Sequence, residues 1–145
     1  MRSVRMLLIL LLFCTANVFA QNQGTTVFNE DKTGVPVTSE NPEFTVKLKS
    51  NPSTGYSWFL REYDPALIVP VKHHYEPPAD RKLMGAPGYE IWTFKVKSEG
   101  FHVPQQTVVR LVYARPWEGV DQSKQVVFRV STIAVPSTSR SQNAE

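Results

Sequence analysis

Apolar and polar residues alternate along most of this chain, and no other feature constrains its fold as strongly. Phe44, Val46 and Leu48 alternate with polar neighbours, which is typical of a β-strand with one buried and one solvated face. Four later segments repeat the pattern. Their expected inward residues are Tyr56, Trp58 and Leu60; Trp92, Phe94 and Val96; Val109, Leu111 and Tyr113; and Val126, Phe128 and Val130.

Turn-forming residues separate these segments, and none of them shows a convincing helical period. Residues 67–75 predict a further strand that ends before Pro77-Pro78, and residues 33–37 predict a short edge strand that carries Pro36. Six or seven short strands with turns between them predict an all-β fold, specifically an immunoglobulin-like antiparallel β-sandwich.

The first 20 residues have the composition of a signal peptide. Arg2 and Arg5 precede an apolar run from Met6 to Phe13, and Val18-Phe19-Ala20 places small residues at the positions that signal peptidase reads. We therefore expect cleavage after Ala20 and export to the periplasm or the extracellular medium. The apolar run is shorter than the roughly 20 residues that span a bilayer, so a permanent membrane anchor is the weaker alternative.

The rest of the chain is expected to form one domain at residues 25–135, followed by a mobile polar tail at residues 136–145. Removing residues 1–20 lowers the formal charge from +3 by two, to +1, because that segment holds two arginines and no acidic residue. Nucleic-acid binding requires clustered basic residues on one face, so nucleic acid is not an expected partner of this nearly neutral domain.

Cys14 is the only cysteine, so the mature domain is expected to fold on its hydrophobic core without disulfides. The missing thiols also exclude thiol catalysis and thiolate metal ligands. Cys14 follows an apolar run, as a lipoprotein cysteine would, but Phe13 is bulkier than the small residue expected before such a cysteine. Lipidation is therefore the weaker alternative.

No motif indicates an enzyme, a cofactor site or a metal site. His73 and His74 are adjacent on an expected strand and so point to opposite faces, while His102 is distant in sequence. The serines and histidines lack a nucleophile elbow or any other catalytic context. Trp58 and Trp92 alternate with polar neighbours and are expected in the core. We expect a monomeric binding protein without a cofactor or metal.

Three segments between the expected strands carry residues suited to recognition. In Asn51-Pro52-Ser53-Thr54-Gly55-Tyr56, Pro52 fixes φ at about −65°, Gly55 can supply a positive φ, and the Asn51 side chain can bond backbone two residues on. Such a stiff loop loses little entropy on binding. The other two segments are Leu83-Met84-Gly85-Ala86-Pro87-Gly88 and Arg115-Pro116-Trp117-Glu118-Gly119.

Alternate loops of a sandwich gather at one end, so the three segments are expected at the same edge. An exposed Trp117 and Arg115 there would fit an interface hot spot, because these residue types dominate binding energy. By itself, the first segment is better explained as an ordinary turn between two strands. The three segments together favour a binding surface.

In this order, Asn51 to Tyr56, Gly85-Ala86-Pro87-Gly88 and Arg115-Pro116-Trp117 resemble the chagasin family of cysteine-protease inhibitors. The family pattern is an Asn-Pro-Thr-Thr-Gly-aromatic loop, a glycine-rich loop and an Arg-Pro-Trp loop at similar spacing. Tyr75-Glu76-Pro77-Pro78 also looks like the segment that precedes the family's glycine-rich loop. The resemblance covers roughly residues 33–133, and three motifs in order make it specific.

The resemblance implies a reversible inhibitor that holds a β-sandwich end-on against the active-site cleft of a papain-like cysteine protease. Ser53 and Thr54 would lie nearest the catalytic thiol, and a proline-stiffened loop would fill the cleft without presenting a scissile bond in attack geometry. The protease-binding residues that it implies are Asn51, Pro52, Ser53, Thr54, Gly55, Tyr56, Gly85, Ala86, Pro87, Gly88, Arg115, Pro116 and Trp117.

Within this implied surface, Trp117 would lie on an aromatic or apolar wall of the enzyme, with Arg115 bonding or stacking nearby and Pro116 stiffening the ridge. Gly85 and Gly88 would let backbone approach the other side of the cleft, where a Cβ would clash. An alternative is a β-sandwich that binds a glycan or a surface protein, with the aromatic loops as a stacking platform, because one fold hosts many functions.

Two residues depart from the family pattern: Ser53, where threonine is usual, and Pro87 inside the glycine-rich loop. Serine keeps the hydroxyl and loses a methyl group, which costs about 1 kcal/mol of packing at most, so Ser53 is expected to retune selectivity without abolishing binding. Pro87 is expected to stiffen its loop. The stretch from Phe101 to Val108 is longer than the pattern predicts, and the sequence assigns it no role.

Overall fold

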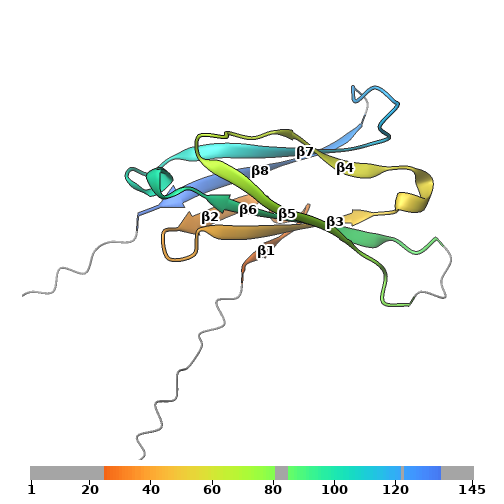
Figure 1. The fold of residues 1–145 in the computed structure, drawn as a ribbon, viewed down its shortest axis with the longest axis horizontal. Coiled ribbons are helices and arrows are strands. Elements are labelled where there is room, and N and C mark those ends of the chain that lie inside the picture. Colours follow the sequence, from red (N-terminus) through yellow and green to blue (C-terminus); the bar gives the residue numbers. More distant parts are fainter. Residues whose placement is uncertain (1–24, 81–84, 122, 135–145) are drawn as a thin grey trace, which may run out of the picture.

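The computed structural model describes residues 25–80, 85–121 and 123–134, which fold into two packed four-stranded sheets (Figure 1). The first sheet contains, in spatial order, β1 (Val27–Phe28), β3 (Glu43–Ser50), β6 (Gly88–Val96) and β5 (Ile68–Glu76). The second sheet contains β2 (Gly34–Thr38), β8 (Lys124–Ile133), β7 (Gln106–Ala114) and β4 (Ser57–Glu62). Two short 3-10 helices are η1 (Pro52–Thr54) and η2 (Ser98–Phe101). The predicted all-β sandwich is confirmed.

The inward residues of the alternating segments meet between the two sheets. The Phe44 and Phe94 rings stack with their centroids 5.3 Å apart. Trp58 is 2% exposed and Trp92 packs against the same core, so both tryptophans take the core positions expected of them. The other buried residues that the alternation predicted are Val46, Leu48, Val96, Val109, Leu111, Val126, Phe128 and Val130.

The two edge strands nearest the N-terminus pair in parallel, which the alternation did not predict. β1 runs parallel to β3, and β2, which carries Pro36, runs parallel to β8; the other neighbouring strands are antiparallel. Between β1 and β2 the Asn29 side chain accepts the backbone N–H groups of Asp31 and Lys32 in a tight turn. This turn carries the chain from the first sheet to the second, so each strand joins a partner that is distant in sequence.

The stretch from Phe101 to Val108 begins in η2 and covers the end of the sandwich opposite η1 (Figure 1). Phe101 packs against the core. Gly100 is also buried, and a Cβ there would lie 3.0 Å from the Val96 side chain. The backbone N–H of Gln105 donates to Thr132 Oγ1 of β8 at 2.8 Å. This stretch therefore has a structural role that the sequence did not reveal.

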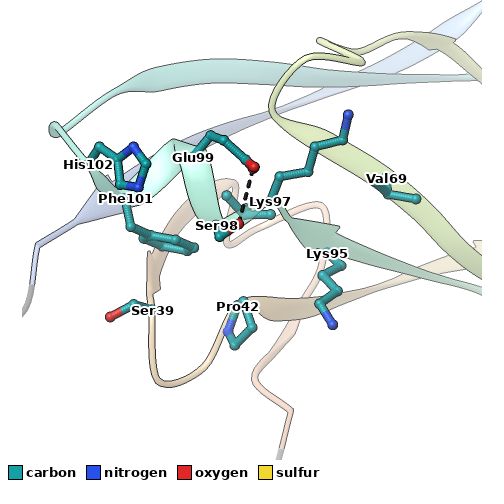
Figure 2. Close-up of a pocket in the computed structure, with 10 residues that line it drawn as sticks. Ser39, Pro42, Val69, Lys95, Lys97, Ser98, Glu99, Phe101 and His102 are labelled. Carbon is teal, nitrogen blue, oxygen red and sulfur yellow. Dashed lines mark hydrogen bonds between the residues drawn. The ribbon is translucent and has the colours of Figure 1, made fainter.

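A hollow of about 860 Å³ opens beside η2 at this end of the sandwich (Figure 2). Phe101 forms part of its wall, and Lys95 and Lys97 lie around it. Several of its polar groups already have partners within the chain: Lys97 Nζ donates to a backbone carbonyl at 2.8 Å, and the Ser98 hydroxyl donates to Glu99 at 3.2 Å. A hydrogen bond from its own backbone, followed by the Ser98 hydroxyl, lowers the pKa of Glu99. None of the predicted protease-binding residues lines this hollow.

Residues 1–24 and 135–145 lie outside the described part of the chain, so the signal peptide, its cleavage after Ala20 and the polar tail stay predictions. Among the described residues, no helix is long and apolar enough to cross a membrane. The strands run from Val27 to Ile133, within the domain expected at residues 25–135.

Candidate functional site

The three predicted recognition loops lie together at the end of the sandwich opposite η2, on the right of Figure 1. The wedge loop, residues 51–56, connects β3 to β4 and so crosses from the first sheet to the second. The glycine-rich loop, residues 85–88, leads into β6, and the Arg-Pro-Trp loop, residues 115–119, follows β7. The expectation that all three open at one edge is confirmed, while Leu83 and Met84 lie outside the described residues.

The wedge loop is a compact turn held by its own hydrogen bonds. The Thr54 N–H donates to Asn51 O at 3.1 Å, and the Gly55 N–H donates to Pro52 O at 2.9 Å. Gly55 ends the turn with φ at 80°, the left-handed region that favours glycine. The Ser53 hydroxyl donates to Asn51 Oδ1 at 2.6 Å, and the Thr54 hydroxyl donates to Asn51 O at 2.7 Å. Asn51 Oδ1 thus accepts a side-chain hydroxyl rather than the backbone N–H that the sequence suggested.

Asn51 also joins the wedge loop to both of its neighbours. Its Nδ2 donates to Gly85 O of the glycine-rich loop at 3.2 Å, and its backbone N–H donates to the Tyr113 hydroxyl at the end of β7 at 2.9 Å. The Tyr113 ring in turn stacks on Tyr56, with the centroids 5.3 Å apart. One asparagine therefore sets the position of the wedge loop relative to both sheets.

Arg115 ties the Arg-Pro-Trp loop to the wedge loop. Its Nε donates to Thr54 O at 3.1 Å, and its Nη1 donates to Glu118 Oε1 at 3.0 Å. The guanidinium carbon lies 4.5 Å from the centroid of the Tyr56 ring, a cation–π distance. The hydrogen bond with Glu118 is the main cause that raises the pKa of Arg115. The side chain keeps its charge and holds two loops together.

Trp117 is 72% exposed, the largest exposed fraction among the large hydrophobic residues of the described chain. Its ring lies against the backbone of Gly55, where an added Cβ would stand 3.1 Å from Trp117 Cη2. Two features therefore require a glycine at position 55: the positive φ and the indole that lies close to its backbone. The expected exposure of Trp117 is confirmed, and an exposed indole supported from one side is suited to contact a partner.

The two glycines of the glycine-rich loop have different environments. Gly85 has φ at 81°, and a Cβ there would meet no atom within 4 Å. Gly88 is buried at the start of β6, where a Cβ would collide with the Tyr75 hydroxyl and the Glu76 carbonyl of β5. The sequence interpretation gave both glycines the same role toward a partner. For Gly88 the structure adds a requirement within the first sheet itself.

The structure divides the predicted site residues into a solvent-facing group and a supporting group. The exposed residues are Pro52, Ser53, Thr54, Gly85, Pro87, Pro116 and Trp117. The partly or fully buried residues are Asn51, Gly55, Tyr56, Ala86, Gly88 and Arg115. The first group is the surface that a partner would meet, and the second group holds that surface in place.

Beneath the wedge loop lies a buried carboxylate that the sequence interpretation missed. Glu90 of β6 is 2% exposed and contacts Ser50, Trp58 and His73. A signal for it was present, because Glu90 has the inward parity of Trp92 in the same strand. His73, considered above only as a possible metal ligand, bonds this carboxylate and stacks on Trp92 with the ring centroids 4.1 Å apart.

Together, the fold and the loop cluster define a β-sandwich protein whose candidate recognition surface consists of three loops at one end. The model of the Chagasin family peptidase inhibitor I42 matches residues 37–131, a range that includes all three loops. The chain therefore belongs to the chagasin family of peptidase inhibitors, which is a family of inhibitors rather than of enzymes. The resemblance drawn from the three motifs is confirmed.

Chagasin from Trypanosoma cruzi is 38% identical to this chain over 78 residues, which are 51% of this chain and 66% of chagasin, just under two thirds of that relative's length. The cysteine protease inhibitor EhICP2 from Entamoeba histolytica has a similar fold, with a TM-score of 0.58 and 20% identity over 75% of this chain and 95% of EhICP2. Amebosin gives a TM-score of 0.57 and 19% identity over 75% of this chain and 98% of amebosin. PbICP-C, solved in complex with falcipain-2, gives a TM-score of 0.50 and 15% identity over 75% of this chain and 89% of PbICP-C.

Proposed function

We propose that this protein reversibly inhibits papain-like cysteine proteases by occluding the active-site cleft with the wedge loop, flanked by the glycine-rich and Arg-Pro-Trp loops. Membership of the chagasin family supports the inhibitory function. The observation that carries the proposal is the wedge loop itself: its tip, Pro52 to Thr54, is exposed, and the loop is bonded to one neighbouring loop through Asn51 and to the other through the Thr54 carbonyl. A surface ordered before binding loses little entropy when it binds.

The hydrogen bonds of the wedge loop explain how it would block a protease without being cleaved. Cleavage requires an extended substrate whose carbonyl oxygen enters an oxyanion hole. The loop is a 3-10 turn, and the carbonyl oxygens of Asn51, Pro52 and Thr54 already accept hydrogen bonds within the protein. Each of these three carbonyls would have to give up its hydrogen bond to enter the oxyanion hole, which would disfavour cleavage at these positions.

Affinity is expected to come mainly from the Arg-Pro-Trp loop and from contact area. Trp117 offers a mostly exposed indole, which is the commonest kind of hot-spot residue. Three loops at one end of a small sandwich are expected to cover roughly 800 Å² per partner, the usual interface size. Ser53 and Thr54 lie at the exposed tip of the wedge loop, the position where we propose contact closest to the catalytic thiol.

Steady-state inhibition of papain by residues 21–145 tests the proposal. We expect inhibition that is reversed by dilution, with the inhibitor recovered at its full mass. Papain whose cleft is filled by a covalent peptide-like blocker should not bind. Lack of inhibition at micromolar concentrations, or equal binding to blocked papain, would contradict the proposal. Quenching of Trp117 fluorescence by a glycan, with no response to a protease, would favour the glycan-binding alternative.

We also infer that the protein acts after export, because the composition of residues 1–20 matches a signal peptide. Mass spectrometry of the protein expressed with its full sequence tests this inference. The expected mature N-terminus is Gln21 in the periplasmic or extracellular fraction. An uncleaved chain retained in the cytoplasm would contradict it.

A further inference from the structure

Glu90 is a buried charged residue at the base of the wedge loop. Its Oε1 accepts the Ser50 hydroxyl at 2.6 Å and the Trp58 backbone N–H at 3.1 Å. On the other side, His73 Nε2 lies 2.9 Å from Oε2. An ionised carboxylate only accepts hydrogen bonds, so this contact requires the ring proton on Nε2 whenever Glu90 is ionised. The side chain of His73 is 43% exposed and that of Glu90 is 3% exposed, so the carboxyl group is buried while the imidazole bonded to it reaches solvent.

The two residues that donate to Oε1 lie on the two stems of the wedge loop, which are the strand ends on either side of it. Ser50 ends β3 in the first sheet and directly precedes Asn51, whereas Trp58 lies in β4 of the second sheet. A second bond joins the same stems, because Trp58 Nε1 donates to Lys49 O at 2.9 Å. Glu90 itself belongs to β6, two residues beyond Gly88. One carboxylate therefore connects both stems of the wedge loop to the strand that begins at the glycine-rich loop.

The bond to Trp58 supplies an acceptor for a backbone N–H group of an edge strand. β4 is an edge strand that pairs only with β7, so the ladder does not satisfy all of its backbone N–H groups. Trp58 is buried, and a buried N–H without an acceptor is strongly unfavourable. Glu90 supplies that acceptor from the opposite sheet. Without it, the stem of the wedge loop would separate from the first sheet or admit water.

We propose that Glu90 is a positioning residue for inhibition: its carboxylate clamps the two stems of the wedge loop and fixes the loop relative to the glycine-rich loop. This inference rests on the proposed protease inhibition and adds a residue that does not face the partner. Glu90 acts through the position of the exposed tip, so its loss weakens binding even when the fold is retained.

Two substitutions at Glu90 separate positioning from charge. Glu90→Ala removes the acceptor for both stems, and we expect inhibition of papain to weaken roughly tenfold or more, as for loss of buried charged hydrogen bonds. Glu90→Gln keeps an oxygen that can accept from Ser50 and Trp58. Its amide N–H can donate to His73 Nε2 when the ring proton is on Nδ1. Glu90→Gln should restore inhibition to within about threefold of the original protein.

A matched control lies at the other end of the sandwich. Thr132 is 5% exposed and bonds the backbone of Gln105 through Oγ1. Thr132→Val removes a buried polar contact of comparable kind without touching the loops, so it should lower the melting temperature and leave the inhibition constant unchanged. Amide hydrogen exchange supplies a second readout. The Trp58 N–H should exchange slowly in the original protein and in Glu90→Gln, and rapidly in Glu90→Ala.

Each outcome of these experiments either supports or overturns the role of Glu90 as a positioning residue. A folded Glu90→Ala with unchanged inhibition and unchanged Trp58 protection overturns it, and so does a Thr132→Val variant that loses as much inhibition. If Glu90→Ala does not fold, Ser50→Ala and Glu90→Gln decide: the inference requires weaker inhibition and faster wedge-loop exchange in Ser50→Ala, with near-normal behaviour in Glu90→Gln. If the original protein does not inhibit papain, the proposed function fails, while the exchange measurements still test the clamp.

Discussion

At the scale of single residues, side chains of the three loops hold the neighbouring loops in place. Asn51 bonds the glycine-rich loop, and Arg115 bonds the carbonyl of Thr54. Only part of each motif therefore faces solvent, so substitutions in the same motif are expected to act differently. An exposed residue should affect affinity alone, and a supporting residue should affect both affinity and stability.

Trp117→Ala is expected to weaken protease binding by about 2 kcal/mol or more, because the exposed indole has the character of a hot-spot residue. The melting temperature should change little, since Trp117 is 72% exposed. Inhibition constants for papain measure the effect. Val103→Ala is a suitable control, because Val103 is 59% exposed and follows η2 at the opposite end. Unchanged affinity of Trp117→Ala would show that the Arg-Pro-Trp loop is not part of the interface.

Gly55→Ala and Gly85→Ala form a matched pair, because both glycines have φ near 80° but only Gly55 has a neighbour close to the added methyl group. Each substitution should lower the free energy of unfolding by about 1 kcal/mol through backbone strain. Gly55→Ala should also displace Trp117 and weaken inhibition further. Denaturant unfolding and inhibition assays separate these effects. Equal losses of inhibition in both variants would argue against the contact with Trp117.

At the scale of the elements, β-strand pairing requires particular residues beside the loops. Gly88 is needed where β6 begins because the Tyr75 side chain and the backbone of Glu76 in β5 occupy the space of a Cβ. The register of β5 and β6 thus depends on a residue that the motif alone would assign to binding. Gly88 shows how a recognition motif can include a residue that serves the fold.

Gly88→Ala is expected to reduce the free energy of unfolding by about 1–3 kcal/mol, the usual cost of overpacking. Because Glu76 contributes a backbone atom, the neighbouring strand cannot relieve the contact by a side-chain rotation alone. Urea unfolding measures the change, and Gly34→Ala, with no atom within 4 Å of the added methyl group, is the control. A Gly88→Ala variant as stable as the original protein would disprove the steric requirement.

At the scale of the whole molecule, the sandwich separates the loop-bearing end from the end closed by η2 (Figure 1). The described residues hold the core, all eight strands and the three loops. The core and the surface that we propose for binding therefore belong to one connected set of described residues.

A chain trimmed to residues 25–134 is accordingly expected to fold and to inhibit papain within about threefold of residues 21–145. The trimmed chain contains no cysteine, so adding a reductant should leave its melting temperature unchanged. Circular dichroism during heating and the papain assay provide the two measurements. Loss of folding after trimming would show that residues 21–24 or 135–145 stabilise the sandwich.

The sequence by itself predicted the fold class and the three loops that gather at one end of the sandwich, because both depend on local patterns. Alternation predicted the inward faces that contain Phe44, Trp58 and Phe128, since side chains of a strand point to opposite faces in turn. The three loop motifs identified the family because their residue types and order are properties of the chain alone. The inward position of Glu90 could also have been predicted from the alternation, because Glu90 lies on the same face of its strand as Trp92.

Only the tertiary structure decided how the loops support one another. The bonds from Asn51 to Gly85 and from Arg115 to Thr54 join residues that are 34 and 61 positions apart, and the clamp at Glu90 joins strands of both sheets. Such contacts follow from the packing of one sheet on the other and from the register of the strands. No local pattern encodes them, because they exist only when distant segments meet.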